Sequence, residues 1–265
     1  MDNTNRFTGR AEDYDRYRQR YPTEEILTRL REWGGLTPQW LVADIGAGTG
    51  MVAEVFLANG NRVLAVEPNL DMREQMRPCV EQHLGCPAPQ LEIIDATAEA
   101  TTLPDASIDL VAVGRAFHWF DTERSLAEFR RILKPEGWVT LVAADRDRDA
   151  KDPAYRPQID AYEHLMETHG PDYTHVVGTG YRTYDRMEDF FDGEFHHAEL
   201  PGTRPLDWDT FRGHTMSLSV SPQPGHPNHQ AFQQALRSYF ETYARDGILT
   251  LPTTCWITAA RFRGQ

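Results

Sequence analysis

The sequence has few cysteines, and they form no pattern that indicates a disulfide framework. Its three cysteines, Cys79, Cys86 and Cys255, include no Cys-x-x-Cys motif. The longest apolar runs are far shorter than a membrane span, and residues 1–6 lack the apolar core of a signal peptide. We therefore expect a cytoplasmic protein that does not associate with membranes.

Positive charge is also scarce. The chain has 27 lysines and arginines against 40 aspartates and glutamates, a formal net charge of −13. An acidic protein repels the phosphates of nucleic acids, so DNA and RNA are not expected partners. Metal-ligand spacing is missing too, since His196 and His197 would point to opposite faces of a strand. No further Cys/His set accompanies His226 and His229, so no metal site is predicted.

What stands out instead is a glycine-rich loop between an apolar strand and a helix. The strand, residues 41–45, contains Asp44 near its end, and residues 51–57 have the pattern of a helix. Three glycines alternate with small residues in the loop: Gly46, Gly48 and Gly50. Glycine allows a ligand to approach the backbone closely, and a helix N-terminus presents unpaired N–H groups. Met51 stands where a dinucleotide fingerprint has its third glycine, so the residues favour another nucleotide-like ligand, or an ordinary glycine-rich turn.

The rest of the chain first alternates strands with helices and then becomes less regular. Expected strands are 62–67, 91–94, 110–113, 139–143, 194–200 and 254–262. Expected helices include 24–33, one opening at 69–72, 122–133, 155–169, 208–216 and 228–246. Residues 134–138 are expected to form a turn, and the charged run 145–151 an exposed edge or linker. Glu67 lies where a carboxylate accepts hydrogen bonds from ribose hydroxyls, although a solvated strand-end charge is the alternative.

Four segments carry a resemblance to a known family. Asp44-Ile45-Gly46-Ala47-Gly48-Thr49-Gly50 resembles the first motif, (D/E)-x-G-x-G-x-G, of the class I S-adenosylmethionine (SAM) methyltransferases. Residues 95–109 are similar to the adenine loop of that family, with Ala96 and Thr97 in place of its usual glycine and aspartate. Residues 117–120 resemble the A-F-H-W-F/M pattern of the small-molecule branch that includes trans-aconitate methyltransferase-like proteins. Residues 133–137 match the L-K-P-x-G pattern that precedes strand five.

The resemblance implies an α/β fold with a Rossmann-like, seven-stranded sheet. The expected strand order is 3-2-1-4-5-7-6, with strand seven antiparallel and helices on both faces. Residues 1–265 would form one domain, as a monomer or homodimer. Its expected parts are N-terminal lid helices (1–35), a SAM-binding half (36–144), a partly inserted substrate cover (145–228), and a final helix and strand (229–265).

The resemblance also implies a SAM site, with S-adenosylhomocysteine (SAH) as the product. Thr97 or Asp95 would meet the adenine amino group, the backbone of Ala98 a ring nitrogen, and Glu67 the ribose. Met72 would cover the adenine, unless it belongs to the helix core. The expected cofactor-binding residues are Tyr14, Arg18, Tyr21, Asp44, Gly46, Ala47, Gly48, Gly50, Glu67, Pro68, Met72, Thr97, Ala98, Gly114, Arg115 and Ala116.

The segment from Phe7 to Tyr21 is rich in arginine and tyrosine. Tyr14, Arg18 and Tyr21 fall on one helical face. A solvated arm is one interpretation. The resemblance implies a lid, in which Arg18 pairs with the methionine carboxylate of SAM and an aromatic ring approaches the sulfonium.

Phe117, His118 and Trp119 follow the fourth strand, at the sheet edge where ligands bind in open α/β folds. We expect them to line the acceptor side, with His118 as a candidate general base or as a packed, hydrogen-bonded histidine. The expected function is transfer of the SAM methyl group to an O, N or C atom of a small-molecule acceptor by in-line displacement. The alternatives are an NAD(P)-dependent oxidoreductase and a non-catalytic SAM-binding protein.

Overall fold

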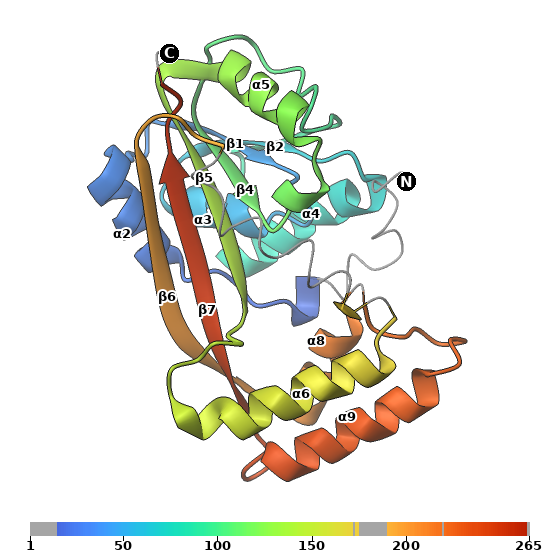
Figure 1. Cartoon of the computed structure of the whole chain (residues 1–265). Coiled ribbons are helices and arrows are strands. Elements are labelled where there is room, and N and C mark those ends of the chain that lie inside the picture. The colour runs from blue at the N-terminus through green and yellow to red at the C-terminus, as the bar shows by residue number, and fades with distance from the viewer. Residues whose placement is uncertain (1–14, 172, 175–189, 219, 264–265) are drawn as a thin grey trace.

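The computed structural model describes residues 15–171, 173–174, 190–218 and 220–263. Its strands form one seven-stranded sheet in the order β3-β2-β1-β4-β5-β7-β6 (Figure 1). The strands are β1 (Leu41–Ile45), β2 (Arg62–Val66), β3 (Leu91–Ile94), β4 (Ile108–Gly114), β5 (Leu133–Arg146), β6 (Phe195–Leu206) and β7 (Leu249–Ala260). The first five strands are parallel, and β7 is antiparallel to both β5 and β6. The predicted fold class and strand order are confirmed.

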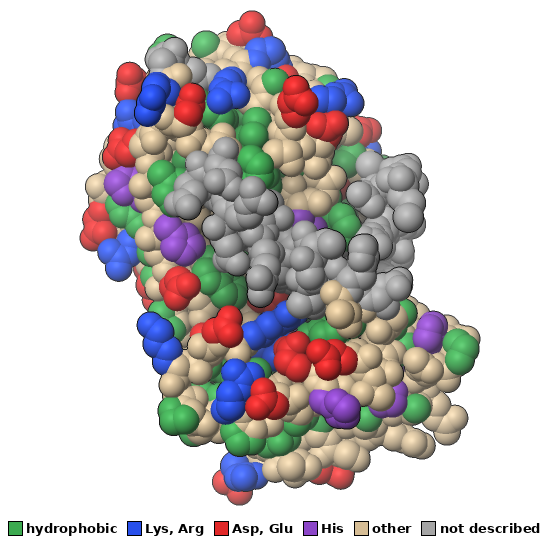
Figure 2. All heavy atoms as spheres, viewed as in Figure 1, with side chains coloured by type: hydrophobic (Ala, Val, Ile, Leu, Met, Phe, Trp, Pro, Cys, Tyr) green, Lys and Arg blue, Asp and Glu red, His purple; other side chains and the backbone are tan. Residues whose placement is uncertain are grey.

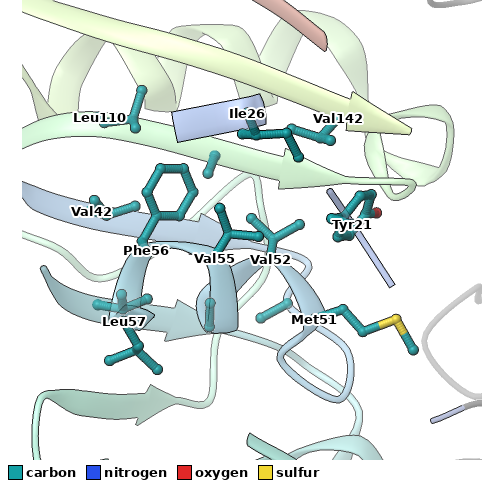
Figure 3. Close-up of a cluster of buried hydrophobic side chains, with 14 of the residues drawn as sticks. Tyr21, Ile26, Val42, Met51, Val52, Val55, Phe56, Leu57, Leu110 and Val142 are labelled. Carbon is teal, nitrogen blue, oxygen red and sulfur yellow. The ribbon is translucent and has the colours of Figure 1, made fainter. Parts of the chain in front are cut away.

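Helices cover both faces of the sheet. They are α2 (Thr23–Gly34), α3 (Met51–Ala58), α4 (Leu70–Leu84), η2 (Phe117–Trp119), α5 (Thr122–Ile132), η3 (Pro153–Tyr155), α6 (Arg156–His169), α8 (Trp208–Met216) and α9 (His229–Tyr243). On one face, α2, α3 and α4 bury apolar side chains against the sheet, and on the other α5 does so. Figure 3 shows side chains of α3 directed towards Val42, Leu110 and Val142 of three neighbouring strands. Alternate residues of β5 pack into the apolar cores on the two faces of the sheet, because successive strand residues point to opposite faces.

Capping residues fix several helix ends where the sequence predicts them. The side chain of Asn69 accepts from the N–H of Met72 at the start of α4, and Asp121 accepts from Arg124 at the start of α5. Gly35 takes a left-handed conformation, with φ of 72°, and ends α2.

A helical cap of α6, α8 and α9 lies beyond the ends of β5, β6 and β7 (Figure 1). It has an apolar core of its own, which includes Tyr162 of α6, Phe211 of α8 and Phe232 of α9. The buried face of α9 packs into this cap. Among the helices that the structure describes, none combines the length and apolar character that crossing a membrane requires.

Several boundaries differ from the prediction: β6 and β7 are both longer than expected, and three further differences have a clear structural cause. The expected turn at 134–138 is a bulge inside β5, since Leu133 pairs with Ile108 and Trp138 pairs with Leu110. The expected linker begins later, because residues 145 and 146 pair with β7. Helix α9 ends at Tyr243 instead of continuing to 246: residues 245–248 form a tight turn, with φ of 49° at Asp246 and 76° at Gly247, that leads into β7.

Candidate functional site

The glycine loop lies at the carboxyl end of β1 and is tied to β2. The N–H groups of Gly46 and Ala47 both donate to the carbonyl of Val66, at 2.8 and 3.1 Å. All three loop glycines have positive φ: 68° at Gly46, 59° at Gly48 and 90° at Gly50. These left-handed conformations favour glycine over residues with a Cβ, so the loop's shape depends on its glycines.

The three glycines differ in what surrounds them. A Cβ on Gly46 would lie 2.8 Å from Cβ of Ala116, and one on Gly50 would lie 2.5 Å from Cγ2 of Val80. A Cβ on Gly48 would have no described atom within 4 Å. Gly46 and Gly50 thus allow close packing inside the protein, whereas Gly48 faces open space that a ligand can approach.

Two buried carboxyl groups accompany the loop. Glu67 accepts from the N–H of Gly48 at 2.8 Å and from the N–H of Asn69 at 2.9 Å. Burial raises the pKa of Glu67, against the opposing effect of these two donors. Asp44 is fully buried and accepts from the N–H of Ala53 at 2.9 Å. Burial raises the pKa of Asp44 to about 8. Glu67 therefore borders the loop, while Asp44 holds the first turns of α3 beneath it.

Arg115, directly after β4, connects the loop region to the N-terminal segment. Its backbone has a φ of 52°, which is uncommon for a residue other than glycine. Its guanidinium donates to the hydroxyl of Tyr21 at 3.1 Å, to the carbonyl of Gln19 at 2.9 Å and to that of Ala144 at 3.0 Å. The hydroxyl of Tyr21 also lies 3.0 Å from where a Cβ on Gly114 would be. Tyr21, Gly114 and Arg115 are thus brought together, with Arg115 making contacts within the protein.

Residues 15–21, called the arm from here on, contain Tyr21 and also Arg18, the other predicted lid residue that the structure describes. Arg18 is buried, and its guanidinium lies 3.5 Å from the carbonyl of Ser217 in the cap. Arg18 also lowers the pKa of Asp145, at the end of β5, against the effect of burial. Tyr14 and the rest of the segment that begins at Phe7 lie outside the described residues. The structure therefore places Arg18 between the sheet and the cap.

The predicted adenine-binding residues lie along the ends of β2 and β3. Met72 and Ala98 are buried, and the carbonyl of Thr97 accepts from the N–H of Ala100 at 3.3 Å. The carbonyl of Pro68 accepts from Arg73 at 2.7 Å. The same guanidinium pairs with Asp95 at 2.7 Å, so Arg73 links the end of β2 with the end of β3.

The acceptor-side residues separate into a buried and a partly exposed set. Phe117 is 1% exposed and packs against Phe120 and Phe190, at ring distances of 6.0 and 5.7 Å. The rings of His118 and Trp119 lie 4.4 Å apart, and both residues are half-buried. Phe117 is therefore placed in the core, and His118 and Trp119 remain accessible to a ligand.

Two features of the structure are not predicted from the sequence. A cavity of about 750 Å³ lies at the ends of β5 and β7, beside the segment 146–155, and its lining includes Asp145, Glu199 and Trp256. Figure 2 shows acidic and basic side chains mixed between the sheet half and the cap. The charged run after β5 is the signal for it in the sequence, but charge alone predicts an exposed linker there.

The second missed feature is a cluster around Arg20 of the arm. Asp15, Glu54 and His83 bring potential metal-ligating atoms within 4.8 Å of one another. The guanidinium of Arg20 lies among them, 2.7 Å from Asp15, 3.0 Å from Glu54 and 2.6 Å from His83. Arg20 thus supplies the positive charge there and ties the arm to α3 and α4.

Comparison with family models matches residues 43–141, which contain the glycine loop and Glu67, to a model described as a methyltransferase domain. The chain contains a methyltransferase domain. This agrees with the SAM-dependent methyltransferase family that the glycine motif predicts.

Individual relatives extend the match beyond this domain. An uncharacterised methyltransferase of Mycobacterium tuberculosis H37Rv is 35% identical over 134 residues, 51% of this chain and 50% of that protein. One of Schizosaccharomyces pombe is 28% identical over 159 residues, 58% and 56% of the two chains. The chain spans about half the length of the curated relatives that it matches.

A solved structure covers more of the molecule. A candidate type II methyltransferase from Anaeromyxobacter dehalogenans is 26% identical, with a TM-score of 0.64 over 92% of this chain and 98% of that one. The likeness therefore includes the cap as well as the methyltransferase domain.

Proposed function

We propose that the protein is an enzyme that binds SAM and transfers its methyl group to an O, N or C atom of a small-molecule acceptor, leaving SAH. The observation that carries this proposal is the open, left-handed backbone at Gly48 beside the buried carboxyl group of Glu67. The backbone at Gly48 faces open space, while Gly46 and Gly50 on either side pack against the protein. A loop of this shape lets a nucleoside approach the backbone closely.

The residues around the loop fit this donor. Glu67 accepts one backbone N–H at each oxygen, and each carboxylate oxygen has a further lone pair for a ribose hydroxyl. The hydroxyl of Thr49 and Oδ1 of Asp44 are buried without a hydrogen-bond partner among the described residues. Buried polar atoms are normally paired, so these two support a ligand or ordered water at the loop. We propose that Arg18 pairs with the methionine carboxylate.

SAM, when bound, supplies a methyl group that its sulfonium already activates. The protein's part is then to align the acceptor and exclude water. The arm and the cap would cover the carboxyl edge of the sheet, with Trp119 and His118 on the acceptor side. His118 would take up a proton where the acceptor atom carries one. The net charge of −13 supports a small-molecule acceptor over a nucleic acid.

Calorimetry with SAH and with NADH tests the donor assignment directly. We expect SAH to bind and NADH to show no binding at the same concentrations. Methyl transfer from labelled SAM to a panel of small alcohols, amines and carboxylic acids then tests turnover. Binding of NADH but not SAH would refute the proposal, and SAH binding with no methylated product would indicate a non-catalytic SAM-binding protein.

A further inference from the structure

The arm lies between the sheet half and the cap, and each side binds its backbone. From the sheet, Arg115 donates to the carbonyl of Gln19 at 2.9 Å. From the end of β6, which borders the cap, Arg204 donates to the carbonyl of Tyr17 at 2.8 Å. His214 of α8 has Nδ1 at 3.2 Å from the same carbonyl. Two arginines from distant parts of the chain thus hold carbonyls only two residues apart.

A glycine in α8 provides independent evidence that the cap is shaped for the arm. Gly213 lies inside α8, where glycine weakens a helix relative to alanine. A Cβ at this position would lie 2.5 Å from Cε1 and 2.6 Å from Cζ of Tyr17. The glycine therefore lets the tyrosine ring pack directly against the helix backbone.

The charges around the arm are costly to assemble. Burial, together with Arg115 and Arg18, lowers the pKa of Arg204 to about 10. Burial, with Arg18 and Arg204, lowers the pKa of His214 to about 3, so the imidazole is neutral near pH 7. Asp145 is the carboxylate that stabilises Arg204 within this group. Placing several positively charged groups close together where they are partly buried is unfavourable. A cluster of this kind therefore indicates that these arginines have a role beyond an ordinary surface contact.

We propose that Arg115 and Arg204 are positioning residues that hold the arm across the carboxyl edge of the sheet, so that donor binding is transmitted through the arm to the cap. This inference rests on the proposed function, in which Arg18 of the arm pairs with the donor. Arg115 acts on the donor side, where it also holds Tyr21. Arg204 and Gly213 act on the cap side. Donor binding then stabilises α8 through the arm.

Hydrogen exchange with and without SAH tests the transmission without a known acceptor. In the wild type we expect SAH to slow exchange in both the arm and α8, by about tenfold or more. Arg204→Gln and Gly213→Ala should reduce the slowing in α8 to less than about twofold, while SAH still binds and the arm retains part of its protection. Arg204→Lys keeps the charge but loses the forked donor, so it should give an intermediate value.

Two comparisons make the experiment decisive. Arg212→Gln is the matched control, because that guanidinium is on α8 but donates to Gln233 in α9, and it should leave both protections unchanged. Gly213→Ala favours the helix, so a melting curve should show that the fold is kept. If SAH does not bind the wild type, the proposed function fails and this inference with it. If SAH protects the arm but not α8, or if the control loses the α8 protection, only the inference is overturned.

Discussion

The backbone N–H of Gly48 donates to Oε2 of Glu67 at 2.8 Å, which joins the loop after β1 to the end of β2. The second oxygen of Glu67 accepts from Asn69, so the carboxyl group is oriented by the protein alone. A group that is already oriented loses little freedom when a ligand binds. We therefore expect the donor affinity to depend strongly on this pair.

Glu67→Ala should weaken SAH binding by roughly tenfold or more. The physical reason is that hydrogen bonds to a charged group contribute about 1.5–3 kcal/mol each, and about 1.4 kcal/mol corresponds to a factor of ten. Calorimetry measures the change, and Glu67→Gln, which keeps an acceptor for the N–H of Gly48, is the control for loss of the loop's shape. A change below about twofold for Glu67→Ala would contradict the ribose assignment.

Gly48→Val should abolish measurable SAH binding while the protein stays folded. The added side chain would enter the open space beside the loop and would strain a backbone with φ of 59° by about 1–3 kcal/mol. Gly46→Val is the contrasting variant, because its Cβ would lie 2.8 Å from Ala116 and 3.0 Å from Phe120. Thermal melts should show a larger loss of stability for Gly46→Val. Unchanged SAH affinity in a folded Gly48→Val protein would show that the loop is not the donor site.

The sequence predicts most of the sheet and the loop, because these depend on local patterns. Each of these patterns involves only a few neighbouring residues. They are the apolar strands, the alternating glycines, and Asn69 and Asp121 as the first, N-capping residues of α4 and α5. The strand order is implied by the resemblance of these motifs to the methyltransferase family, and it agrees with the sheet of the structure. The match to a methyltransferase-domain model supports that resemblance.

The remaining features depend on contacts between distant residues. Residues 145 and 146 look like a solvated linker, yet pairing with β7 makes them strand. Arg115 is predicted to bind the cofactor, and the sequence gives no sign that its guanidinium also donates to the carbonyl of Gln19, 96 residues away. Phe117 looks like a ligand-facing aromatic and packs instead against Phe190, across a long stretch of chain. Such contacts are decided by tertiary packing, which single-sequence patterns do not report.

His118→Ala should lower the rate of methyl transfer and change SAH affinity by less than about twofold. His118 lies in η2 beside Trp119, on the side predicted to meet the acceptor. A positioned general base contributes typically about 10²- to 10⁴-fold, so a fall of at least about tenfold is expected where the acceptor atom carries a proton. Rates with labelled SAM and calorimetry with SAH separate the two effects. A variant that loses SAH affinity but keeps its rate would place His118 on the donor side.

Asp44 makes the stability of the protein depend on pH. Burial raises its pKa from an ordinary value of 3.8 to about 8 in the folded state, so the folded protein holds this proton more tightly than the unfolded chain does. The contribution of Asp44 to the free energy of unfolding is then fully present below about pH 4 and is lost as the pH rises towards about 8.

Asp44→Asn should therefore gain stability over the wild type as the pH is raised. The amide has no proton to lose in this range, and its oxygen can still accept from the N–H of Ala53. The difference in unfolding free energy should be small near pH 4 and should grow in favour of the variant, by at most about 1.4 kcal/mol per pH unit, until about pH 8. Other groups with raised pKa values, such as Glu54, are present in both proteins, so their effects largely cancel in the difference. Urea unfolding at a series of pH values measures it. A difference that stays constant from pH 5 to pH 8 would mean that Asp44 is ionised throughout in the folded protein, with a stabilising partner at its second oxygen.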